Sequence, residues 1–332
     1  MKKVFVTGSS GFIGSHLVER LLKLGYKVKA LVPYNINNNW GWLDNIEKSS
    51  LKEIEVISGD ICDYNFILKE TKKIDLIFHL AALISIPYSY ESPRSYISTN
   101  VDGTLNILEA GKLNNVKKIV NTSTSEVYGS AQKIPINENH PLNAQSPYAA
   151  TKISADQLTM SYYRSFDLPV TILRPFNTFG PRQSLRAAIP TIISQIVLGK
   201  KEIKLGNLKA TRDFTYVSDT VEGYIKTIKN KKCIGETINL GTGYDFSIKK
   251  TVDLISSILN KNITVISDKK RIRPKKSEVN RLVSDNKKAL KILNWKPIYS
   301  RESGFKEGLK KTVEWFTKKE NLKHYKSNLY NL

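Results

Sequence analysis

KKVFVTGSSGFIGSHLVERLLKLG, residues 2–25, is the stretch that decides the fold. Its first part is rich in β-branched and aromatic residues, which predicts a strand, and its last part carries apolar residues at helical spacing. Gly8, Gly11 and Gly14 separate the two as G-x-x-G-x-x-G. Glycines at such a turn let the backbone approach a diphosphate, and the following helix offers free N–H groups at its N-terminus. The stretch therefore predicts a dinucleotide site between a strand and a helix.

Strands and helices alternate through the rest of the first half. This alternation predicts parallel pairing with right-handed crossovers, and hence an α/β fold with a doubly wound parallel sheet. In that architecture ligands bind beyond the carboxyl ends of the strands. Further strands are expected at 27–32, 54–60, 75–82, 117–129 and 169–175, and further helices at 103–114 and 146–166.

After about residue 178 strands and helices no longer alternate regularly, which predicts a smaller second domain. We expect its helices at 186–199, 249–259 and 303–319. The first, dinucleotide-binding domain is expected to comprise residues 1–177 and 214–242, and the second domain residues 178–213 and 243–332. A loosely held tail is expected from about Lys323.

The composition excludes several classes of protein. The 332 residues can bury a substantial core, and no apolar run approaches the roughly 20 residues that span a bilayer. The N-terminus breaks into glycines too early for a signal peptide, so we expect a cytoplasmic protein with no membrane partner. Two cysteines and four scattered histidines match no zinc spacing, and no metal is expected.

The formal net charge of +22 indicates an anionic partner. The lysines are spread along the chain, with clusters at 229–233 and 268–276. No aromatic-interleaved basic motif and no zinc finger accompanies them. A phosphorylated metabolite is therefore favoured as the partner, and no nucleic acid is expected.

The second strand bears on which dinucleotide is bound. Such strands usually end in an acid that binds the adenine-ribose hydroxyls, but this one does not. No nearby arginine can hold a 2′-phosphate, so NAD is favoured and NADP is not excluded. Asn35 could bind the ribose edge, or its loop could only carry Trp40 and Trp42 as packing residues. Asp60 could meet the adenine amino group or be an ordinary turn residue.

Tyr148 and Lys152 lie four residues apart in the stretch SPYAATK. Ser146 is expected as the N-cap and Pro147 as the first residue of a helix, which places both side chains on one face. A nearby ammonium and a cationic nicotinamide ring both favour a phenolate, which can then act as a base. Thr124, at the end of the preceding strand, could hydrogen-bond the same substrate oxygen as Tyr148.

Together these features resemble the extended short-chain dehydrogenase/reductases that act on nucleotide sugars. The resemblance covers nearly the whole chain and keeps the order of the motifs. The other matching stretches are HLAA (79–82), NVDGTLNILEA (100–110), RPFNTFGPRQ (174–183) and RDFTYVSD (212–219). The resemblance implies a Rossmann domain, a smaller C-terminal domain that binds the nucleotide-diphosphate sugar, and a homodimer that pairs helices near 94–112 and 147–166.

The resemblance also implies roles for individual residues. Cofactor contacts are implied for Gly8, Gly11, Phe12, Ile13, Gly14, Asp60, Ile61, Leu80, Ala81, Ala82, Asn100, Tyr148 and Lys152. Substrate contacts are implied for Ser85, Thr124, Asn177, Arg186, Arg212, Arg273 and Glu278. The implied catalytic residues are Thr124, Ser125, Glu126, Tyr148 and Lys152.

Glu126 favours some of the reactions known in the resembling family over others. Family members first oxidise the sugar at C4, while Tyr148 takes the proton of the 4-hydroxyl. A 4,6-dehydratase then needs a base for the C5 proton, whereas a 4-epimerase needs no carboxylate there. The triplet Thr124-Ser125-Glu126 resembles that of GDP-mannose 4,6-dehydratases, although UDP-glucuronate decarboxylases carry it too. Either Ser125 or Glu126 could protonate the leaving hydroxyl.

Two longer stretches, 34–44 and 146–193, most resemble the GDP-N-acetylglucosamine 4,6-dehydratases of legionaminic-acid biosynthesis. The favoured interpretation is therefore an NAD(P)-dependent nucleotide-sugar 4,6-dehydratase that acts on GDP-GlcNAc. A decarboxylase and a 4-epimerase are the alternatives. A non-catalytic dinucleotide sensor is disfavoured because Glu126, Tyr148 and Lys152 are all present.

Overall fold

The computed structural model describes residues 2–326. Within this range seven parallel strands form one sheet, in the order β10-β6-β5-β4-β1-β2-β3. These strands are β1 (Lys3–Thr7), β2 (Lys27–Val32), β3 (Ile54–Ser58), β4 (Leu76–His79), β5 (Lys118–Thr122), β6 (Val170–Pro175) and β10 (Glu236–Leu240). The central strands are buried on both faces, which explains why their sequences are nearly continuous apolar runs.

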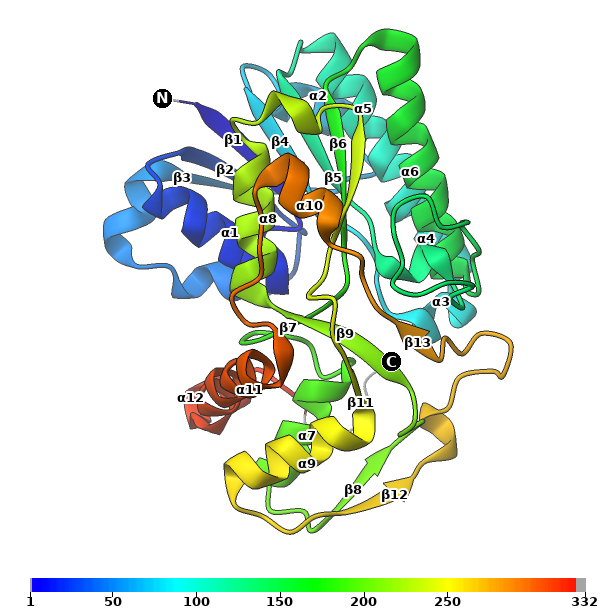
Figure 1. The fold of residues 1–332 in the computed structure, drawn as a ribbon. Coiled ribbons are helices and arrows are strands. Elements are labelled where there is room, and N and C mark those ends of the chain that lie inside the picture. Colours follow the sequence, from blue (N-terminus) through cyan, green and yellow to red (C-terminus); the bar gives the residue numbers. More distant parts are fainter. Residues whose placement is uncertain (1, 327–332) are drawn as a thin grey trace.

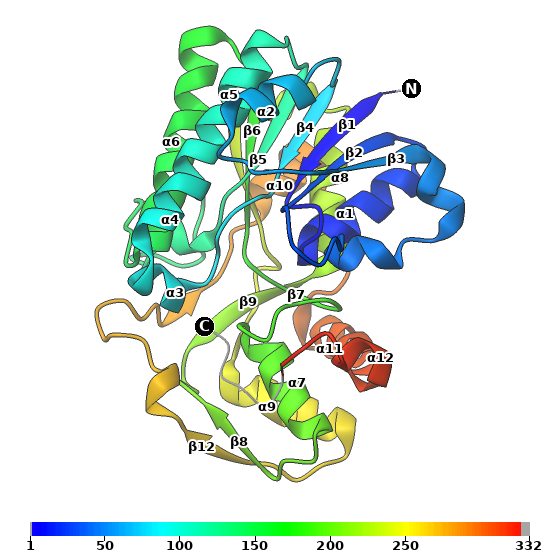
Figure 2. The same cartoon turned by 180° about the vertical axis from the view of Figure 1, so that it is seen from behind.

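Helices cover both faces of this sheet (Figures 1 and 2). One face carries α1 (Phe12–Lys23) and α8 (Val217–Thr227), which pack against each other. The other face carries α2 (Tyr64–Glu70), α5 (Gly103–Leu113) and α6 (Pro147–Phe166). The strands form a separate apolar core with each helical layer. The predicted doubly wound α/β sheet is confirmed.

The strand order changes direction between β1 and β4. The chain builds outward from β1 to β3 on one side and from β4 to β10 on the other. The connections that follow β1 and β4 leave on opposite faces, so a crevice opens at the carboxyl ends of these two strands. Ligands of doubly wound sheets bind at such a switch point. The glycine turn after β1 and the loop 80–85 after β4 both lie there.

A second, smaller unit lies beyond the carboxyl edge of the large sheet (Figure 1). In it β9 pairs with β7, β11 and β13, and β8 pairs with β12. Its strands are β7 (Asn177–Phe179), β8 (Glu202–Leu205), β9 (Thr211–Tyr216), β11 (Asp245–Ser247), β12 (Thr264–Ser267) and β13 (Arg281–Leu282). Its helices are α7 (Ala188–Val197), α9 (Ile248–Leu259), α11 (Arg301–Thr317) and α12 (Lys319–Leu322).

Aromatic rings fill the core of this unit. Phe179, Phe214 and Phe246 surround Phe305 of α11, at ring-centroid distances of 5.3, 5.2 and 4.5 Å. Aromatic pairs at such separations contribute about 0.5–1.5 kcal/mol each beyond their buried area. Because Phe214 lies on β9 and Phe179 on β7, these contacts fix both strands against α11.

The remaining helical segments are shorter. They are α3 (Ile86–Glu91), α4 (Pro93–Ile97), α10 (Lys287–Leu293), the π-helical turn η3 (Ser98–Asp102), and the 3-10 turns η1 (Gly41–Asn45), η2 (Lys48–Glu53), η4 (Ser125–Tyr128), η5 (Lys231–Cys233) and η6 (Lys269–Arg271). The turn η3 follows α4 directly and leads directly into α5. The three segments therefore form one continuous helical stretch with a π-helical turn in its middle. Such π-turns are frequent at functional sites.

The observed packing differs from the expected domain boundaries at two points. Strand β9 belongs to the second sheet as far as Tyr216, so the chain returns to the large domain after residue 216 rather than at 214. Helix α10, expected in the second domain, packs against α8 and β10 of the first. Asp219 of α8 holds this segment, since its carbonyl accepts from Trp295 Nε1 and its carboxylate from Tyr299 N, both at 2.8 Å.

The segment after α12 also differs from the expectation. The sequence predicts a loosely held tail from about Lys323, but the rings of His324 and Tyr325 lie 5.2 and 5.8 Å from that of Trp42. Tyr325 N also donates to the carbonyl of Leu322 at 2.9 Å. Aromatic contacts therefore hold residues 323–326 in place, although their polar composition predicts a loosely held segment. Residues 327–332 of the predicted tail lie outside the described residues.

Candidate active site

The glycine turn after β1 is packed too closely for larger residues at two positions. A side-chain carbon on Gly14 would lie 2.1 Å from the Gly8 carbonyl oxygen, and one on Gly8 would lie 2.7 Å from Ala81 N. Gly11 is the exposed N-cap of α1, and no side chain caps the helix or places an acid in its first turn. The N–H groups that begin with Phe12 thus remain available to an anion. The turn fits the diphosphate of a dinucleotide.

Buried hydrogen bonds join this turn to the loop after β4. The Thr7 hydroxyl oxygen accepts from the backbone N–H groups of Leu80 and Ala81, both at 3.1 Å. The same hydroxyl lies 2.8 Å from His79 Nδ1. Leu80, Ala81 and Ala82 are partly buried beside the turn, and their contact with a cofactor stays a prediction.

His79 extends the network as a neutral ring. Its Nε2 lies 3.1 Å from the hydroxyl of Thr104, and that hydroxyl donates its own proton to the carbonyl of Asn100. The Thr104 oxygen must therefore accept from Nε2–H, which makes Nδ1 the acceptor of the Thr7 proton. Burial, assisted by Lys152, lowers the pKa of His79 to about 3. The ring is thus a fixed structural link.

Asn100 is fully buried in the π-helical turn. Its Nδ2 donates to Leu83 O and to Thr151 Oγ1, both at 3.0 Å, and its Oδ1 accepts from Leu83 N at 2.8 Å. These contacts occupy the side chain inside the protein. Asn100 therefore positions the loop 80–85 against α6, and its predicted contact with a cofactor stays a prediction.

The residues near the expected ribose edge make local turns. Asn35 Nδ2 donates to the carbonyls of Pro33 and Asn39, at 3.2 and 2.9 Å, which favours the structural alternative for this loop. Asp60 Oδ1 accepts from Cys62 N at 2.9 Å while the residue stays exposed. Ile61 is buried in the core below. The adenine contact of Asp60 stays a prediction.

Thr124 and Tyr148 meet from adjoining elements. Thr124 is the N-cap of η4, and its hydroxyl accepts from Glu126 N at 3.2 Å. Tyr148 lies in the first turn of α6, where Ser146 is the N-cap and accepts from Ala149 N at 3.1 Å. The predicted start of this helix is confirmed. The Thr124 hydroxyl also acts on the phenol of Tyr148, since it lowers the pKa of Tyr148, so the two hydroxyls are neighbours.

The protein alone does not produce the expected phenolate. Burial raises the pKa of Tyr148 well above its ordinary value, and the hydrogen bond with Thr124 offsets only part of that rise. Burial also lowers the pKa of Lys152 to about 8, against the opposite effect of Asp156. Desolvation therefore outweighs the lowering that the sequence predicts from Lys152. A positive charge supplied by a ligand is what can lower the pKa of Tyr148 further.

Asp156 binds buried cations near Tyr148 and Lys152. Its Oδ2 accepts from Arg174 Nε at 3.1 Å, from Arg174 Nη2 at 2.9 Å and from Ser123 Oγ at 2.7 Å. Both members of this ion pair are buried, where an unpaired charge is costly. Asp156 therefore ties α6 to β6, and its charge offsets part of the cost of burying Lys152 one helical turn away.

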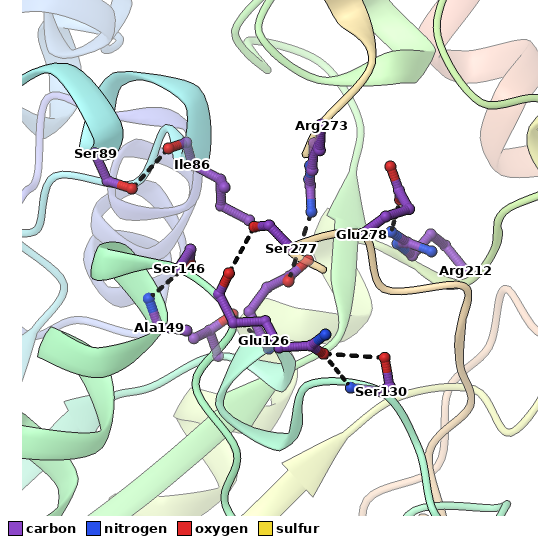
Figure 3. Close-up of polar contacts among 12 residues, drawn as sticks. Ile86, Ser89, Glu126, Ser130, Ser146, Ala149, Arg212, Arg273, Ser277 and Glu278 are labelled. Atoms are coloured by element: carbon purple, nitrogen blue, oxygen red, sulfur yellow. Dashed lines mark hydrogen bonds and ion pairs between the residues drawn. The ribbon is translucent and has the colours of Figure 1, made fainter. Parts of the chain in front are cut away.

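Glu126 faces an arginine from the segment that links β12 to β13 (Figure 3). Its side chain is 12% exposed, and its Oε2 lies 3.7 Å from Arg273 Nη1. That nitrogen is buried and makes no hydrogen bond, so the ion pair is loose. The negative charge of Glu126 also raises the pKa of Tyr148. A carboxylate therefore stands beside the phenol at the place the sequence predicts.

Arg212 of β9 completes a charged cluster with Glu126, Arg273 and Glu278 (Figure 3). Its Nη2 lies 3.6 Å from Glu278 Oε1, and its Nη1 donates to Thr211 O at 2.9 Å. Burial lowers the pKa of Arg212, whereas Glu126 and Glu278 raise it. The structure thus brings together two cations and two carboxylates from distant parts of the chain.

Asp213 holds Arg212 in place, and sequence reasoning missed it. Its carboxylate accepts from Thr242 N and Thr242 Oγ1 at 2.8 and 2.7 Å, from Gly243 N at 2.9 Å and from Ser284 N at 3.1 Å. Burial raises its pKa to about 6. The one sequence feature that could have pointed to Asp213 is its position next to Arg212. Its hydrogen-bond partners could not, because they are remote in the chain.

Tyr96 of α4 lies close to two of the predicted substrate residues, Ser85 and Arg186. Its hydroxyl donates to the carbonyl of Ser85, and its ring lies edge-on to that of Tyr148 at 6.2 Å. Burial raises the pKa of Tyr96, and the charge of the nearby Arg186 lowers it. Ser85 and Arg186 therefore lie near Tyr96, the residue whose ring meets that of Tyr148. Asn177 lies on β7, where its Oδ1 is buried without a hydrogen-bond partner.

Ser277 holds the segment that carries Arg273 (Figure 3). The Tyr90 hydroxyl lies 2.6 Å from Ser277 Oγ, which itself donates to the carbonyl of Gln145 at 2.6 Å. Gln145 Nε2 in turn donates to Lys276 O at 2.7 Å. The segment is thus attached to α3 and to the residue before the N-cap of α6.

Neither a metal centre nor a membrane span is found in the described part of the chain. Residues 2–326 contain no group of three or more His, Cys, Asp and Glu side chains that could hold a metal ion. Over the same range no helix combines the length and the apolar character needed to cross a bilayer.

A dinucleotide turn at the switch point and a Thr–Tyr–Lys group beside a second unit define the nucleotide-sugar branch of the short-chain dehydrogenases/reductases. The family model described as GDP-mannose 4,6 dehydratase matches residues 5–310. The chain belongs to this family.

Its relatives carry out more than one reaction. The dTDP-D-glucose 4,6-dehydratase of Homo sapiens is 32% identical, over 98% of this chain and 92% of the relative. A UDP-N-acetylglucosamine 4-epimerase from Methanobrevibacter ruminantium is 34% identical with a TM-score of 0.84, over 95% of this chain and 98% of that one. The dTDP-glucose 4,6-dehydratase DesIV of Streptomyces venezuelae, solved with NAD, is 27% identical with a TM-score of 0.83, over 98% and 99%. Dehydratases and epimerases are thus both represented.

The buried Lys152 predicts an unusual dependence of stability on pH. Its pKa of about 8 in the folded chain lies below the value of 10.5 for a free lysine. The unfolded chain therefore binds more protons in this window, and the free energy of unfolding rises with pH between about 8 and about 10.5. We expect Lys152→Met to be more stable than the wild type by about 1–3 kcal/mol at pH 7 and to lack this rise.

Urea unfolding at pH 7 and pH 10 measures this effect. Lys287→Met is the matched control, because the Lys287 side chain is 88% exposed and its removal should leave the pH dependence intact. An equal change with pH in the wild type and in Lys152→Met would contradict the prediction.

Proposed function

We propose that this protein is an NAD-dependent nucleotide-sugar 4,6-dehydratase whose substrate is GDP-GlcNAc. The observation that carries the proposal is the place of Glu126, a carboxylate close enough to Tyr148 for its charge to act on the phenol. A 4-epimerase requires only the reversible oxidation at C4. A carboxylate held beside that centre supports a further proton transfer.

The glycine turn fits NAD, which accepts a hydride from the sugar and later returns it. Gly8 and Gly14 keep the turn close to α1, and the uncapped N-terminus of α1 meets the diphosphate. Tyr148 and Lys152 then border the nicotinamide end. Because dehydration consumes no net hydride, the cofactor can be reused in every cycle.

Tyr148 and Thr124 act on the 4-hydroxyl of the sugar. The Thr124 hydroxyl is near enough to lower the pKa of Tyr148, which supports one substrate oxygen meeting both hydroxyls. Tyr148 removes the proton as C4 is oxidised, and Thr124 orients the oxygen. The Lys152 ammonium stabilises the phenolate that forms during this step.

Glu126 acts in the elimination that follows. The C4 ketone makes the C5 proton acidic, and Glu126 removes it while the 6-hydroxyl leaves. The proton that Glu126 takes from C5 leaves with the 6-hydroxyl as water. The hydride from C4 is then added at C6, and C5 takes up a proton that balances the one Tyr148 removed from the 4-hydroxyl, so the net change is the loss of one water. Ser125 is only 3% exposed, which favours Glu126 over Ser125 as the acid for the leaving hydroxyl.

The charged cluster suits the diphosphate of the substrate. Arg212 and Arg273 are paired with Glu278 and Glu126 at 3.6 and 3.7 Å, longer than hydrogen-bonded ion pairs. A diphosphate can replace these loose carboxylate contacts and leave Glu126 free to act as a base. The preference for GDP rests on the matching family model and on the stretches 34–44 and 146–193.

A 4-epimerase is the second candidate. The M. ruminantium relative with that name is 34% identical to this chain. The same Thr124, Tyr148 and Lys152 would suffice for it, and Glu126 would then only pair with Arg273. The mass of the product separates the two functions.

Incubation with GDP-GlcNAc, followed by mass spectrometry, tests the proposal. We expect the sugar to lose the mass of one water, because elimination removes the 6-hydroxyl. UDP-GlcNAc, dTDP-glucose and UDP-glucuronate serve as parallel substrates that define the base and the sugar. An isomer of unchanged mass would establish the epimerase, and the loss of carbon dioxide from UDP-glucuronate alone would establish a decarboxylase.

Glu126→Gln tests the role of the carboxylate. We expect C4 oxidation to continue, so that reduced cofactor accumulates, while elimination slows about 10²- to 10⁴-fold because the C5 base is lost. Absorbance of the reduced nicotinamide and the product mass measure the two steps. Ser125→Ala is the control and should still eliminate water. Normal elimination by Glu126→Gln would show that another group is the base.

We also propose a homodimer that pairs α4–α5 and α6 with their copies. Ile97, Leu113 and Phe166 are about half exposed on these helices, which supports an apolar contact there. Sedimentation equilibrium at micromolar concentration should give twice the chain mass of 37.6 kDa. Phe166→Glu should shift the protein toward the monomer, and a monomeric wild type would contradict the proposal.

A further inference from the structure

The loop after β2 rests directly on the dinucleotide turn. Trp42 N donates to the carbonyl of Ser10 at 3.2 Å, and Ser10 lies between Gly8 and Gly11. Gly41 packs so closely that a side-chain carbon on it would lie 3.0 Å from the same carbonyl. The position of the loop 33–45 and the shape of the turn are therefore linked.

The ring of Trp42 is surrounded by rings from the C-terminal part of the chain. Trp315, His324 and Tyr325 lie at centroid distances of 5.4, 5.2 and 5.8 Å from it. We name these four residues the aromatic clasp. Tyr325 also contacts the fully buried Phe316 at 5.3 Å, so the clasp is anchored in the core of the second unit.

Polar contacts hold the second unit to α1 at the same place. Arg182 Nη2 lies 2.6 Å from Glu19 Oε1, and its Nη1 donates to Ser15 Oγ at 3.2 Å. His16 Nε2 is 3.1 Å from the carbonyl of Pro181, and burial lowers the pKa of His16 to about 4. A neutral His16 therefore donates from Nε2. The second unit thus contacts both α1, the helix that follows the glycine turn, and the loop 33–45 beside that turn.

We propose that the aromatic clasp sets how tightly NAD is retained. The loop that follows the second strand of a Rossmann domain borders the adenosine half of the dinucleotide. In this chain β2 ends without the acid that usually holds the ribose, and Asn35 is engaged in the loop's own turn. The hold on the adenosine half therefore rests on the position of the loop, which the clasp maintains.

The inference rests on the proposed NAD cofactor and not on the choice between dehydratase and epimerase. Both reactions return the hydride to the sugar, so both benefit from a cofactor that stays bound through many cycles. A release of the clasp would free the loop 33–45 from the second unit without touching Glu126, Tyr148 or Lys152.

Tyr325→Ala and Tyr325→Phe form the central comparison. Tyr325→Ala removes a ring that packs on both Trp42 and Phe316, so we expect a roughly tenfold higher dissociation constant for NAD and a faster exchange of bound NAD with labelled NAD. Tyr325→Phe keeps the ring and removes a buried hydroxyl that has no hydrogen-bond partner, so its affinity should match that of the wild type. Isothermal titration and exchange dialysis measure these quantities.

His324→Ala is the second variant, since it removes an exposed ring contact with Trp42 and leaves the core intact. It should weaken NAD binding in the same direction, by roughly two- to fivefold, even if Tyr325→Ala does not fold. Unchanged affinity and exchange in both alanine variants would overturn the clasp. A wild type that does not bind NAD in the titration would instead overturn the proposed cofactor.

Discussion

The close approach of Gly8 to the backbone of Leu80 and Ala81 is the constraint on which the site depends. It brings the end of β1 against the loop after β4, and the Thr7 hydroxyl fixes that contact by accepting both N–H groups. Asn100 then holds the same loop by Leu83 and reaches Thr151 on α6. One continuous path of short contacts therefore connects the dinucleotide turn to the helix that carries Tyr148 and Lys152. The two halves of the redox centre are positioned by a single piece of backbone.

The electrostatics of the site suit a Tyr148 that becomes a base only when ligands are bound. Burial opposes the charged form of both Tyr148 and Lys152, and Asp156 is committed mainly to Arg174. Glu126 adds a negative charge that also opposes a phenolate. In the proposed function, a cationic dinucleotide ring would favour the phenolate of Tyr148, and a substrate diphosphate would compete with Glu126 and Glu278 for the arginines. In the free protein, burial therefore favours the neutral phenol of Tyr148.

The sequence predicted the features that local patterns encode. The glycine turn, the alternating strands and helices, and the Ser146 cap that orients Tyr148 each depend on residues within a few positions of one another. The charged cluster could be named only through the resemblance, because Glu126, Arg212 and Arg273 meet from distant elements. Tyr96 and the π-helical turn around Asn100 gave no local signal, and the only signal for Asp213 was its place beside Arg212, since the partners of all three are remote. The predicted tail was wrong for residues 323–326, where the rings of His324 and Tyr325 pack on Trp42, and residues 327–332 lie outside the described residues.

The turn η4 has a consequence for how this family diversifies. Its backbone is set by the Thr124 cap at one end and by Gly129 at the other, where a φ of 60° and a side-chain carbon only 2.2 Å from Asn143 O would exclude other residues. The two side chains that begin the turn, Ser125 and Glu126, do not determine its shape. A substitution of Glu126 would therefore change the charge that this turn presents beside Tyr148 and leave the Thr124 cap and Gly129 in place. Relatives named as a dehydratase and as an epimerase share about a third of their residues with this chain, and a turn built in this way separates the shape of the backbone from the charge it carries.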